Sequence, residues 1–435
     1  MTGRSWSNWG RTSRSTPARI LRPRSVEEVA TALRDAARDG LTVRPVGSAH
    51  SFTALARTDG VLLETHGLAG LRSVDRAAGR ITVGGGTTIG ATARLAHRFG
   101  LAFPNLGDID HQTVAGAIGT GTHGTGGSFG PIASQVVGLQ LVTPGGDVLE
   151  LGEDDPLLPA ARVSLGALGV VTEVTLQCVP AFGLAAEERA EPLAPVVAGF
   201  GDRVAAADHF EFYWFPGTDL ALTKTNTRVS AHAVGPRASR MRRFVDDELL
   251  SNGLFELTCR VGRTAPMLVP ALNRLAARTV AERSYAASSH EVFVSPRRVR
   301  FAESEWAVPL ERVPEAFTAF RSALERSGLR ISFPVEVRAA AADDSAWLST
   351  SFGRPTGYIA VHCYARDVRR EYFRIAERVL TGFEGRPHWG KLHTRDAAAL
   401  RERYPRFDDF VALRRRLDPG GLLRNPHLDR VLGLP

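Results

Sequence analysis

The chain has 435 residues, of which 43% are hydrophobic and 23% charged, and its formal net charge is +8. This length exceeds what one hydrophobic core usually supports, so we expect two domains. No run of about 18 apolar residues occurs, which argues against an integral membrane segment. The arginines are scattered without interleaved aromatic residues, which argues against nucleic-acid binding. The three cysteines show no metal-ligand spacing, so we predict a reduced, cytoplasmic protein with no metal site.

The first part of the chain, residues 1–180, consists of short segments separated by glycines. Ser25 and Glu28 form a capping box that predicts a helix over residues 26–38, which Gly40 ends. Further strands are expected at residues 41–45, 60–64, 80–84 and 170–179, a hairpin at 135–151, a helix at 88–99, and a short helix or turn at 162–168. This mixture predicts an α+β domain.

The character of the sequence changes after Pro180, where glycines become fewer. Helices are expected to carry much of this part, at residues 196–207, 236–252, 267–283 and 310–326, separated by strands at 209–215, 332–339 and 358–364. We therefore predict a second α+β domain over residues 181–400. The closing residues 401–435, which contain Asp418-Pro-Gly-Gly, form a separate C-terminal segment.

Residues 105–131 hold eight glycines and four threonines but no lysine, arginine or glutamate. Such a segment exposes backbone N–H groups, which favours contact with a phosphate-bearing cofactor. It contains G-x-G-x-x-G at Gly119, Gly121 and Gly124, but no helix can begin in the residues that follow, so a Rossmann turn is rejected. The same absence of a strand and a helix makes Ser128 a loop serine rather than a hydrolase nucleophile. We predict an extended backbone track for a pyrophosphate.

A second polar group occurs late in the chain. Glu336 and Arg338 alternate in a strand and so share one face, as do His362 and Tyr364. Lys391, one of only two lysines, follows His388 closely. These side chains suit a polar substrate with several hydroxyls, although a solvated strand face remains the alternative. Considered alone, His50, His111 and His123 are loop histidines bonded to backbone.

Several motifs together resemble a known superfamily. The segment Val43-Arg-Pro-Val-Gly-Ser-Ala-His50-Ser, the run Gly84-Gly-Gly86, residues 113–126 and Gly166-Ala-Leu-Gly169 resemble the FAD domain of the vanillyl-alcohol-oxidase superfamily. Glu336-x-Arg338, His388-Trp-Gly-Lys391 and the closing Asp418-Pro-Gly-Gly resemble its narrower sugar-1,4-lactone and alditol oxidase family, which includes L-gulonolactone and D-arabinono-1,4-lactone oxidases. The resemblance extends over nearly the whole chain.

This resemblance implies a two-domain α+β fold of the vanillyl-alcohol-oxidase type. Residues 1–180 would form the FAD-binding domain, residues 181–400 the substrate-binding cap domain, and residues 401–435 a segment that returns to the FAD domain. His50 would carry the FAD covalently. The implied cofactor-binding residues are Gly47, Ser48, His50, Ser51, Gly107, Ala115, Gly116, Gly119, Gly121, Thr122, His123, Gly124, Gly169, Val170 and His388.

The implied reaction is FAD-dependent oxidation of a CH–OH group of an aldono-1,4-lactone by hydride transfer to flavin N5, with oxygen or another acceptor reoxidising the flavin. Glu336, Arg338, His362 and Lys391 would be the catalytic residues: Arg338 and Lys391 stabilise negative charge, and Glu336 orients the hydroxyl or accepts its proton.

An alditol oxidase is the alternative, and a non-flavin hydrolase or a binding protein is a remote one. Tyr364 departs from the His-x-Thr pattern of alditol oxidases. It is expected to narrow the pocket, which favours a lactone. No oligomeric state follows from the sequence.

Overall fold

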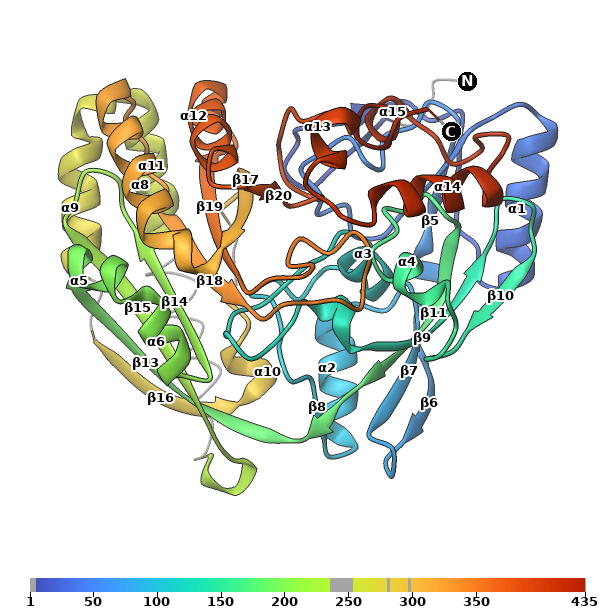
Figure 1. The fold of residues 1–435 in the computed structure, drawn as a ribbon, viewed down its shortest axis with the longest axis horizontal. Coiled ribbons are helices and arrows are strands. Elements are labelled where there is room, and N and C mark those ends of the chain that lie inside the picture. The colour runs from blue at the N-terminus through green and yellow to red at the C-terminus, as the bar shows by residue number, and fades with distance from the viewer. Residues whose placement is uncertain (1–4, 235–252, 280–281, 296–298, 435) are drawn as a thin grey trace.

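Figure 1 shows the computed structural model, which describes residues 5–234, 253–279, 282–295 and 299–434. The chain forms two regions side by side, each built on its own β-sheets. The first region contains most of the residues before β13 together with the C-terminal helices, and the second contains a large sheet with helices on its outer side (Figure 1). In the described part of the chain, no helix is long and apolar enough to cross a membrane.

The first region combines a three-stranded parallel sheet with a five-stranded antiparallel sheet. The parallel sheet has the order β3 (Arg19–Leu21), β5 (Val61–Glu64), β4 (Val43–Val46). The antiparallel sheet has the order β10 (Val148–Leu151), β9 (Val136–Val142), β11 (Val170–Gln177), β7 (Arg80–Gly84), β6 (Leu71–Asp75). Two short pairs join β1 (Trp6–Ser7) to β2 (Arg14–Ser15) and β8 (Leu101–Ala102) to β12 (Val179–Pro180). The helices of this region are α1 (Val26–Arg38), α2 (Ile89–Arg98), α3 (Val114–Gly119), α4 (Leu158–Arg162), α13 (Ala397–Arg401), α14 (Phe407–Leu417) and α15 (Pro426–Leu432), with 3-10 turns at Thr65–Leu68 and Ile132–Gln135.

The predicted helix over residues 26–38 is confirmed as α1. The Ser25 hydroxyl accepts the Glu28 N–H at 3.2 Å, while the Glu28 carboxylate accepts the Arg24 N–H at 2.7 Å, one residue before its usual capping-box partner. Gly40 lies just beyond the helix at φ +67°. The hairpin of β9 and β10 is also confirmed.

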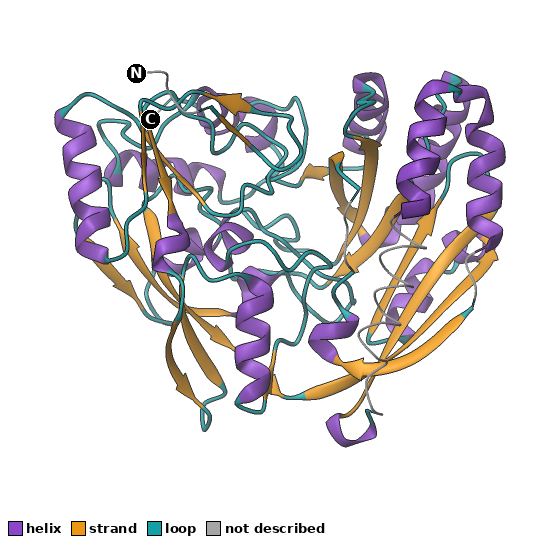
Figure 2. Cartoon of the chain, turned by 180° about the vertical axis from the view of Figure 1, so that it is seen from behind, coloured by secondary structure: helices purple, strands orange, loops and turns teal. Residues whose placement is uncertain are grey.

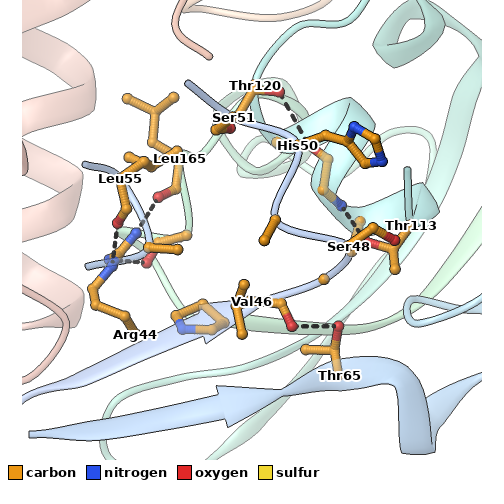
Figure 3. Close-up of a pocket in the computed structure, with 18 of the residues that line it drawn as sticks. Arg44, Val46, Ser48, His50, Ser51, Leu55, Thr65, Thr113, Thr120 and Leu165 are labelled. Atoms are coloured by element: carbon orange, nitrogen blue, oxygen red, sulfur yellow. Dashed lines mark hydrogen bonds between the residues drawn. The ribbon is translucent and has the colours of Figure 1, made fainter. Parts of the chain in front are cut away.

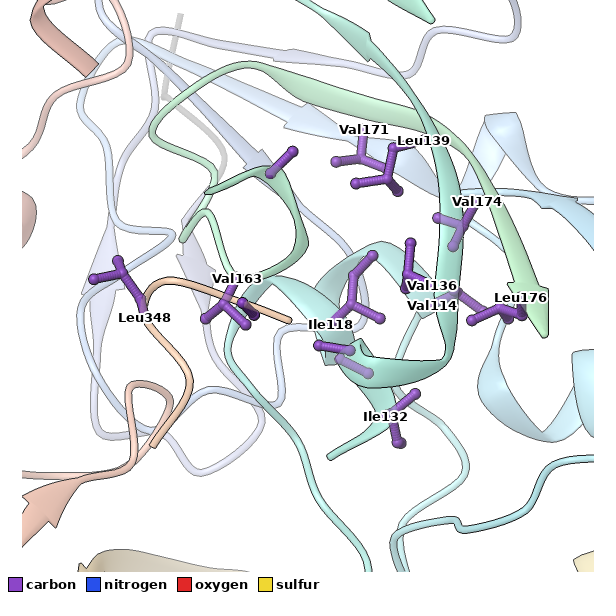
Figure 4. Packing of buried hydrophobic residues seen from close by; sticks show 14 of the residues in the cluster. Val114, Ile118, Ile132, Val136, Leu139, Val163, Val171, Val174, Leu176 and Leu348 are labelled. Carbon is purple, nitrogen blue, oxygen red and sulfur yellow. The ribbon is translucent and has the colours of Figure 1, made fainter. Parts of the chain in front are cut away.

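The short helix α3 was not predicted, because residues 105–131 were expected to be extended throughout. The Thr113 side chain caps α3 by accepting the Gly116 N–H, and Val114 and Ile118 are fully buried. Figure 4 shows these two side chains packed with Val136 and Val174 in the core of the first region. Tertiary packing therefore stabilises a helix that the glycine-rich sequence disfavours.

The short helix or turn expected at residues 162–168 is confirmed as a turn. Helix α4 ends at Arg162, where the expected element begins. Leu165 and Gly166 have φ of +57° and +60°, which no right-handed helix accommodates. The segment is therefore a turn.

The second region is organised by an eight-stranded antiparallel sheet. Its order is β16 (Arg283–Ser288), β13 (Phe182–Pro192), β15 (Leu220–Ser230), β14 (His209–Trp214), β18 (Val335–Ala340), β19 (Thr356–Tyr364), β17 (Phe301–Pro309), β20 (Arg386–Pro387). Its helices are α5 (Leu193–Ala198), α6 (Phe200–Ala206), α8 (Leu254–Thr264), α9 (Val269–Thr279), α10 (Ser289–Val292), α11 (Val313–Ser327) and α12 (Arg370–Thr381), with 3-10 turns at Ala231–Ala233, Pro266–Leu268 and Leu310–Arg312.

The expectation that helices carry much of this region underestimated the sheet, because five strands of the large sheet were missed: β13, β15, β16, β17 and β20. Strands β13 and β15 carry many polar residues, so their patterns do not resemble buried strands. The helix expected at residues 196–207 is divided at Gly199 into α5 and α6. The helix expected at residues 236–252 lies outside the described residues.

The C-terminal segment packs on the first region, and Figure 2 shows the two chain ends close together there. Arg44, on β4, is fully buried and donates to four backbone carbonyls: Leu55 at 2.9 Å, Leu165 at 2.7 Å, Gly166 at 2.8 Å and Leu423 at 2.6 Å. Burial lowers its pKa to about 9. One guanidinium thus joins three distant segments to β4.

Candidate active site at the junction of the two regions

A first cavity of about 860 Å³ lies within the first region (Figure 3). Its walls are the loop that follows β4, helix α3, and the turn that leads into β11. The predicted cofactor-binding residues that line it are Gly47, Ser48, His50, Ser51, Ala115, Gly116, Gly119, Gly169 and Val170. Many of the lining residues are small or uncharged, and Arg44 is the one arginine or lysine among the described residues that line the cavity.

Two glycines show why this wall suits a closely held cofactor. A Cβ atom on Gly47 would lie 2.0 Å from the Thr113 hydroxyl, so the loop after β4 contacts the start of α3 directly. A Cβ on Gly119 would meet no described atom within 4 Å. The space beside Gly119 is therefore open to a ligand that approaches the backbone, as the pyrophosphate of a dinucleotide does.

His50 lies where this cavity meets a second one. Burial lowers its pKa to about 4, with His111 and Lys391 adding to the effect, so the imidazole is neutral at ordinary pH. Its ring stacks on Trp9 with centroids 5.4 Å apart. The preceding Ala49 has φ +56°, a strained value for a residue with a Cβ that places the ring at the junction.

The second cavity, of about 620 Å³, lies between the glycine-rich stretch and the inner face of the large sheet. It shares His50, Ser51, Gln112 and Thr120 with the first cavity, so the two cavities are adjacent at these residues. All four predicted catalytic residues line it: Glu336, Arg338, His362 and Lys391. Gly107, Thr122, His123 and His388, which were predicted to bind the cofactor, line this second cavity instead of the first.

Arg338 is held by carboxylates on both sides. Its guanidinium contacts Glu211 at 2.8 Å and Asp108 at 3.5 Å, and it forms an ion pair with Glu336. Burial alone would lower the pKa of Arg338, but Glu336 and Glu211 outweigh it and raise the pKa well above its ordinary value. Arg338 therefore stays charged and fixed.

Lys391 forms an ion pair with Glu303, a residue of β17. Burial would raise the pKa of Glu303, but the charges of Lys391 and His362 outweigh it and lower the pKa to about 2. The pKa of Lys391 is raised, because Glu303 and Glu305 outweigh the effect of burial. The lysine and the glutamate are therefore both charged.

The histidines of the second cavity have defined tautomers. The Nδ1 atoms of His362 and His123 face the carbonyl oxygens of Pro334 at 3.1 Å and Gly124 at 2.9 Å, so Nδ1 must donate in both rings. On His388, Nδ1 instead accepts the Gly390 N–H at 3.0 Å. Burial lowers the pKa of His388 to about 4, so this ring is neutral and carries its proton on Nε2.

One group has the composition of a metal site. His123, Glu305 and His388 offer ligand atoms within 4.8 Å of one another, and His123 Nε2 lies 3.2 Å from Glu305. A metal ion would need a free lone pair on each ring. On neutral His388 the backbone occupies Nδ1 and the proton occupies Nε2, so the hydrogen bonds favour a proton-sharing group over a metal site.

Three predicted positions lie outside both cavities. Gly121 has φ +74° in a turn, and a Cβ on Gly124 would lie 2.2 Å from the Asn105 side chain, so both glycines serve the fold. Tyr364 does not narrow the site as expected: its hydroxyl donates to Glu256 at 2.6 Å, away from the lining residues. The end of β19 turns its side chain toward α8.

Sequence reasoning missed five charged or aromatic residues that line the second cavity: Phe52, Asp108, Phe301, Glu303 and Glu305. Glu303 and Glu305 alternate in β17 in the same way as Glu336 and Arg338 alternate in β18, and both are nearly fully buried. That alternation was the available signal. It was overlooked because β17 itself was not predicted.

Comparison with known proteins defines the class first. Residues 17–152 match the model of an FAD-binding domain. The structure also resembles cholesterol oxidase from B. sterolicum, with a TM-score of 0.82 and 17% identity over 99% of this chain and 96% of that one, a likeness that shows the fold alone. The protein is an FAD-dependent oxidoreductase with the two-domain fold that the sequence predicted.

The family follows from the second region and from full-length relatives. Residues 174–431 match the model described as D-arabinono-1,4-lactone oxidase. The chain is 44% identical to an L-gulono-1,4-lactone dehydrogenase of Mycobacterium tuberculosis over 98% of this chain and 99% of that protein. It is 33% identical to an alditol oxidase of a Streptomyces species over 98% of both. The chain belongs to the D-arabinono-1,4-lactone oxidase family, as the motifs indicated.

Proposed function

We propose that the chain oxidises a CH–OH group of an aldono-1,4-lactone of the L-gulono or D-arabinono type, with FAD in the first cavity and the lactone in the second. The adjacency of the two cavities, which share His50, Ser51, Gln112 and Thr120 as lining residues, is the observation that carries the proposal. FAD supplies the hydride acceptor, flavin N5. The residues of the chain bind, orient and deprotonate the substrate.

We further propose that His50 holds the FAD covalently. A ring nitrogen must offer a lone pair to form such a bond, and the lowered pKa of His50 provides it at neutral pH. The yellow colour of the protein should survive acid precipitation, and His50→Ala should lose its flavin to the supernatant. Loss of colour from the unmodified protein on precipitation would refute the covalent bond while leaving bound FAD as the hydride acceptor.

The charges of the second cavity favour an uncharged polyol ring over an acid. Arg338 and Lys391 are each already paired with carboxylates, so neither is free to hold a substrate carboxylate. Asp108, Glu303, Glu305 and Glu336 add negative charge that opposes an aldonate. The hydroxyls of a lactone can instead donate to these carboxylates, while the two cations stabilise charge that develops on the oxidised oxygen.

An alditol is the second candidate, because the alditol oxidase relative extends over the same length. Tyr364 was expected to narrow the substrate pocket and so to disfavour an alditol. Because Tyr364 lines neither cavity, this argument against an alditol no longer applies. The higher identity to a lactone dehydrogenase, 44% against 33%, supports the lactone. The hydrolase alternative has no structural support, since Ser128 is exposed and lines neither cavity.

The decisive experiment is an anaerobic substrate panel with L-gulono-1,4-lactone, D-arabinono-1,4-lactone, L-gulonate and xylitol. Bleaching of the flavin absorbance should be fastest with a lactone and absent with gulonate. Bleaching by xylitol alone would overturn the lactone assignment. Admission of oxygen or of an artificial acceptor to the reduced protein then identifies which of them reoxidises the flavin.

A further inference from the structure

Glu303 is a buried carboxylate of the second cavity that the sequence analysis did not mark. It lies on β17 directly opposite His362 on β19 in the antiparallel pairing, and its side chain is 3% exposed. One carboxylate oxygen is 3.4 Å from His362 Nε2, and the other forms the ion pair with Lys391. A single buried group thus contacts two of the residues proposed for catalysis.

The orientation of His362 makes Nε2 its titrating nitrogen. The Pro334 carbonyl has no proton to give, so Nδ1 keeps its hydrogen and neutral His362 presents a lone pair at Nε2. Phe301 and Phe333 pack around the ring, with centroids 5.1 and 6.3 Å away. Nε2 therefore faces the second cavity and Glu303, while the two phenylalanine rings cover other sides of the imidazole.

We infer that His362 Nε2 is the base that takes the proton of the substrate hydroxyl, and that Glu303 is the positioning residue that stabilises the resulting imidazolium and holds Lys391. This assignment rests on the proposed function. In the Ser-His-Asp triad, a carboxylate supports the catalytic histidine by binding the ring nitrogen opposite the one that takes the proton. Here Glu303 serves the same nitrogen that receives the proton, so it acts by charge rather than by fixing the tautomer, which Pro334 does.

Glu336 is less suited to this role. Its carboxylate lies 4.0 Å from His362 Nε2, and it is already engaged in the ion pair with Arg338. The charged groups near His362 are therefore Glu303 and Glu336, with Lys391 and Arg338 behind them. Two carboxylates and two paired cations therefore surround His362, and Glu303 is the carboxylate nearer to Nε2.

The step balances in atoms and electrons. The substrate O–H bond breaks and its proton forms a new bond to His362 Nε2, while the C–H bond breaks and its hydrogen leaves with the electron pair. A C=O bond forms on the substrate. The hydride is accepted by FAD, the oxidant that the family supplies.

The pH dependence of flavin reduction tests the role of Glu303. Glu303→Gln removes the charge that favours imidazolium, so neutral His362 should persist to lower pH and the acid limb should move down by about one to three pH units. The maximal rate should also fall, on the order of 10²-fold, because the imidazolium is less stable. Glu303→Asp should restore part of both. Asp343→Asn is the control: it removes a buried carboxylate that binds Ser345 outside both cavities, and should leave the acid limb in place.

A second measurement needs no turnover. In holoenzyme labelled with ¹⁵N-histidine, the resonances lost in His362→Gln identify His362. Its Nδ1 should stay protonated through the titration while Nε2 gains the proton, and Glu303→Gln should shift that titration to lower pH. A neutral His362 with its proton on Nε2, or a titration unmoved by Glu303→Gln, would overturn the inference. Because this readout requires no substrate, it is separate from any failure to oxidise a lactone.

Discussion

The two cavities are lined by different kinds of residues. The first is lined mainly by uncharged residues of the loop after β4, the short helix α3 and the turn before β11, and several of these residues are glycines. The second is walled by charged side chains that project from strands β17, β18 and β19. A cofactor that never leaves can be held by fixed N–H groups, whereas a substrate that must be deprotonated requires groups with defined protonation.

The largest effect is expected in the second cavity. Replacing Lys391 with methionine keeps the chain length but removes the charge, and should slow flavin reduction about 10²- to 10³-fold. FAD content should be unchanged, because Lys391 does not line the first cavity. Rapid mixing with lactone under anaerobic conditions measures the rate.

Lys224→Met provides the control for this change. Lys224 is the chain's other lysine, is buried and donates to the Val292 carbonyl, away from both cavities. Its replacement should leave the reduction rate nearly unchanged. If both variants lost the same fraction of the flavin-reduction rate, the positive charge of Lys391 in the second cavity would not be what accelerates the reaction.

The contact between the regions should be sensitive to acid. His209 on β14 bonds to the Thr125 carbonyl at 2.6 Å, and burial lowers its pKa to about 4. The unfolded histidine, with a pKa near 6.5, binds more protons between about pH 6.5 and 4, so stability falls as pH falls through that window. Because glutamine does not titrate, the free energy of unfolding of His209→Gln should fall by on the order of 3 kcal/mol less over this pH window than that of the unmodified protein.

Denaturant unfolding of His209→Gln at pH 7 and pH 4.5 measures the difference. The matched variant His66→Gln changes an exposed histidine and should leave the pH dependence of the free energy of unfolding unchanged. A slope that is the same in His209→Gln and in the unmodified protein would exclude His209 as an acid-sensitive contact.

A smaller effect should separate binding glycines from structural ones. Gly119→Ala places a methyl group where the cavity is open, so it should weaken FAD binding by about 1–3 kcal/mol while leaving the apoprotein stable. Gly121→Ala, at φ +74°, should instead cost about 1 kcal/mol of stability. FAD titration in a His50→Ala background measures the affinity without a covalent bond. Equal FAD affinities in the two variants would place Gly119 outside the cofactor wall.

The smallest effect is expected at Tyr364. Tyr364→Phe removes the hydrogen bond to Glu256 at the edge of the second region, at a cost of about 1 kcal/mol or less. The ratio of reduction rates with lactone and xylitol should not change. A changed ratio would return Tyr364 to the substrate pocket.

Sequence reasoning succeeded where the signal is local. The capping box of α1 and the hairpin of β9 and β10 depend on neighbouring residues, and both were predicted. Helix α3 was missed because its six residues are stabilised by core contacts rather than by propensity. The alternation of Glu336 and Arg338 was recognised because their strand was predicted.

The same alternation at Glu303 and Glu305 was missed because β17 was not expected. Two glutamates in nine residues resemble an exposed segment, yet every residue of β17 is buried. What buries them is pairing with β19 and β20 and the cations that converge from elsewhere, and none of these is encoded within the strand. Partners remote in sequence likewise direct Tyr364 toward Glu256.

The four carbonyls that Arg44 binds have a consequence for synthesis. The bond to Leu423 joins residues 379 positions apart, and Asn425 donates nearby to the Ala54, Leu55 and Arg57 carbonyls. At about 5–20 residues per second, a ribosome needs roughly 20–75 s to supply Leu423 after Arg44 has been made. The contacts that fix Arg44 and Leu55 in the wall of the first cavity are thus complete only at the end of translation, so we expect the finished chain to take up the cofactor.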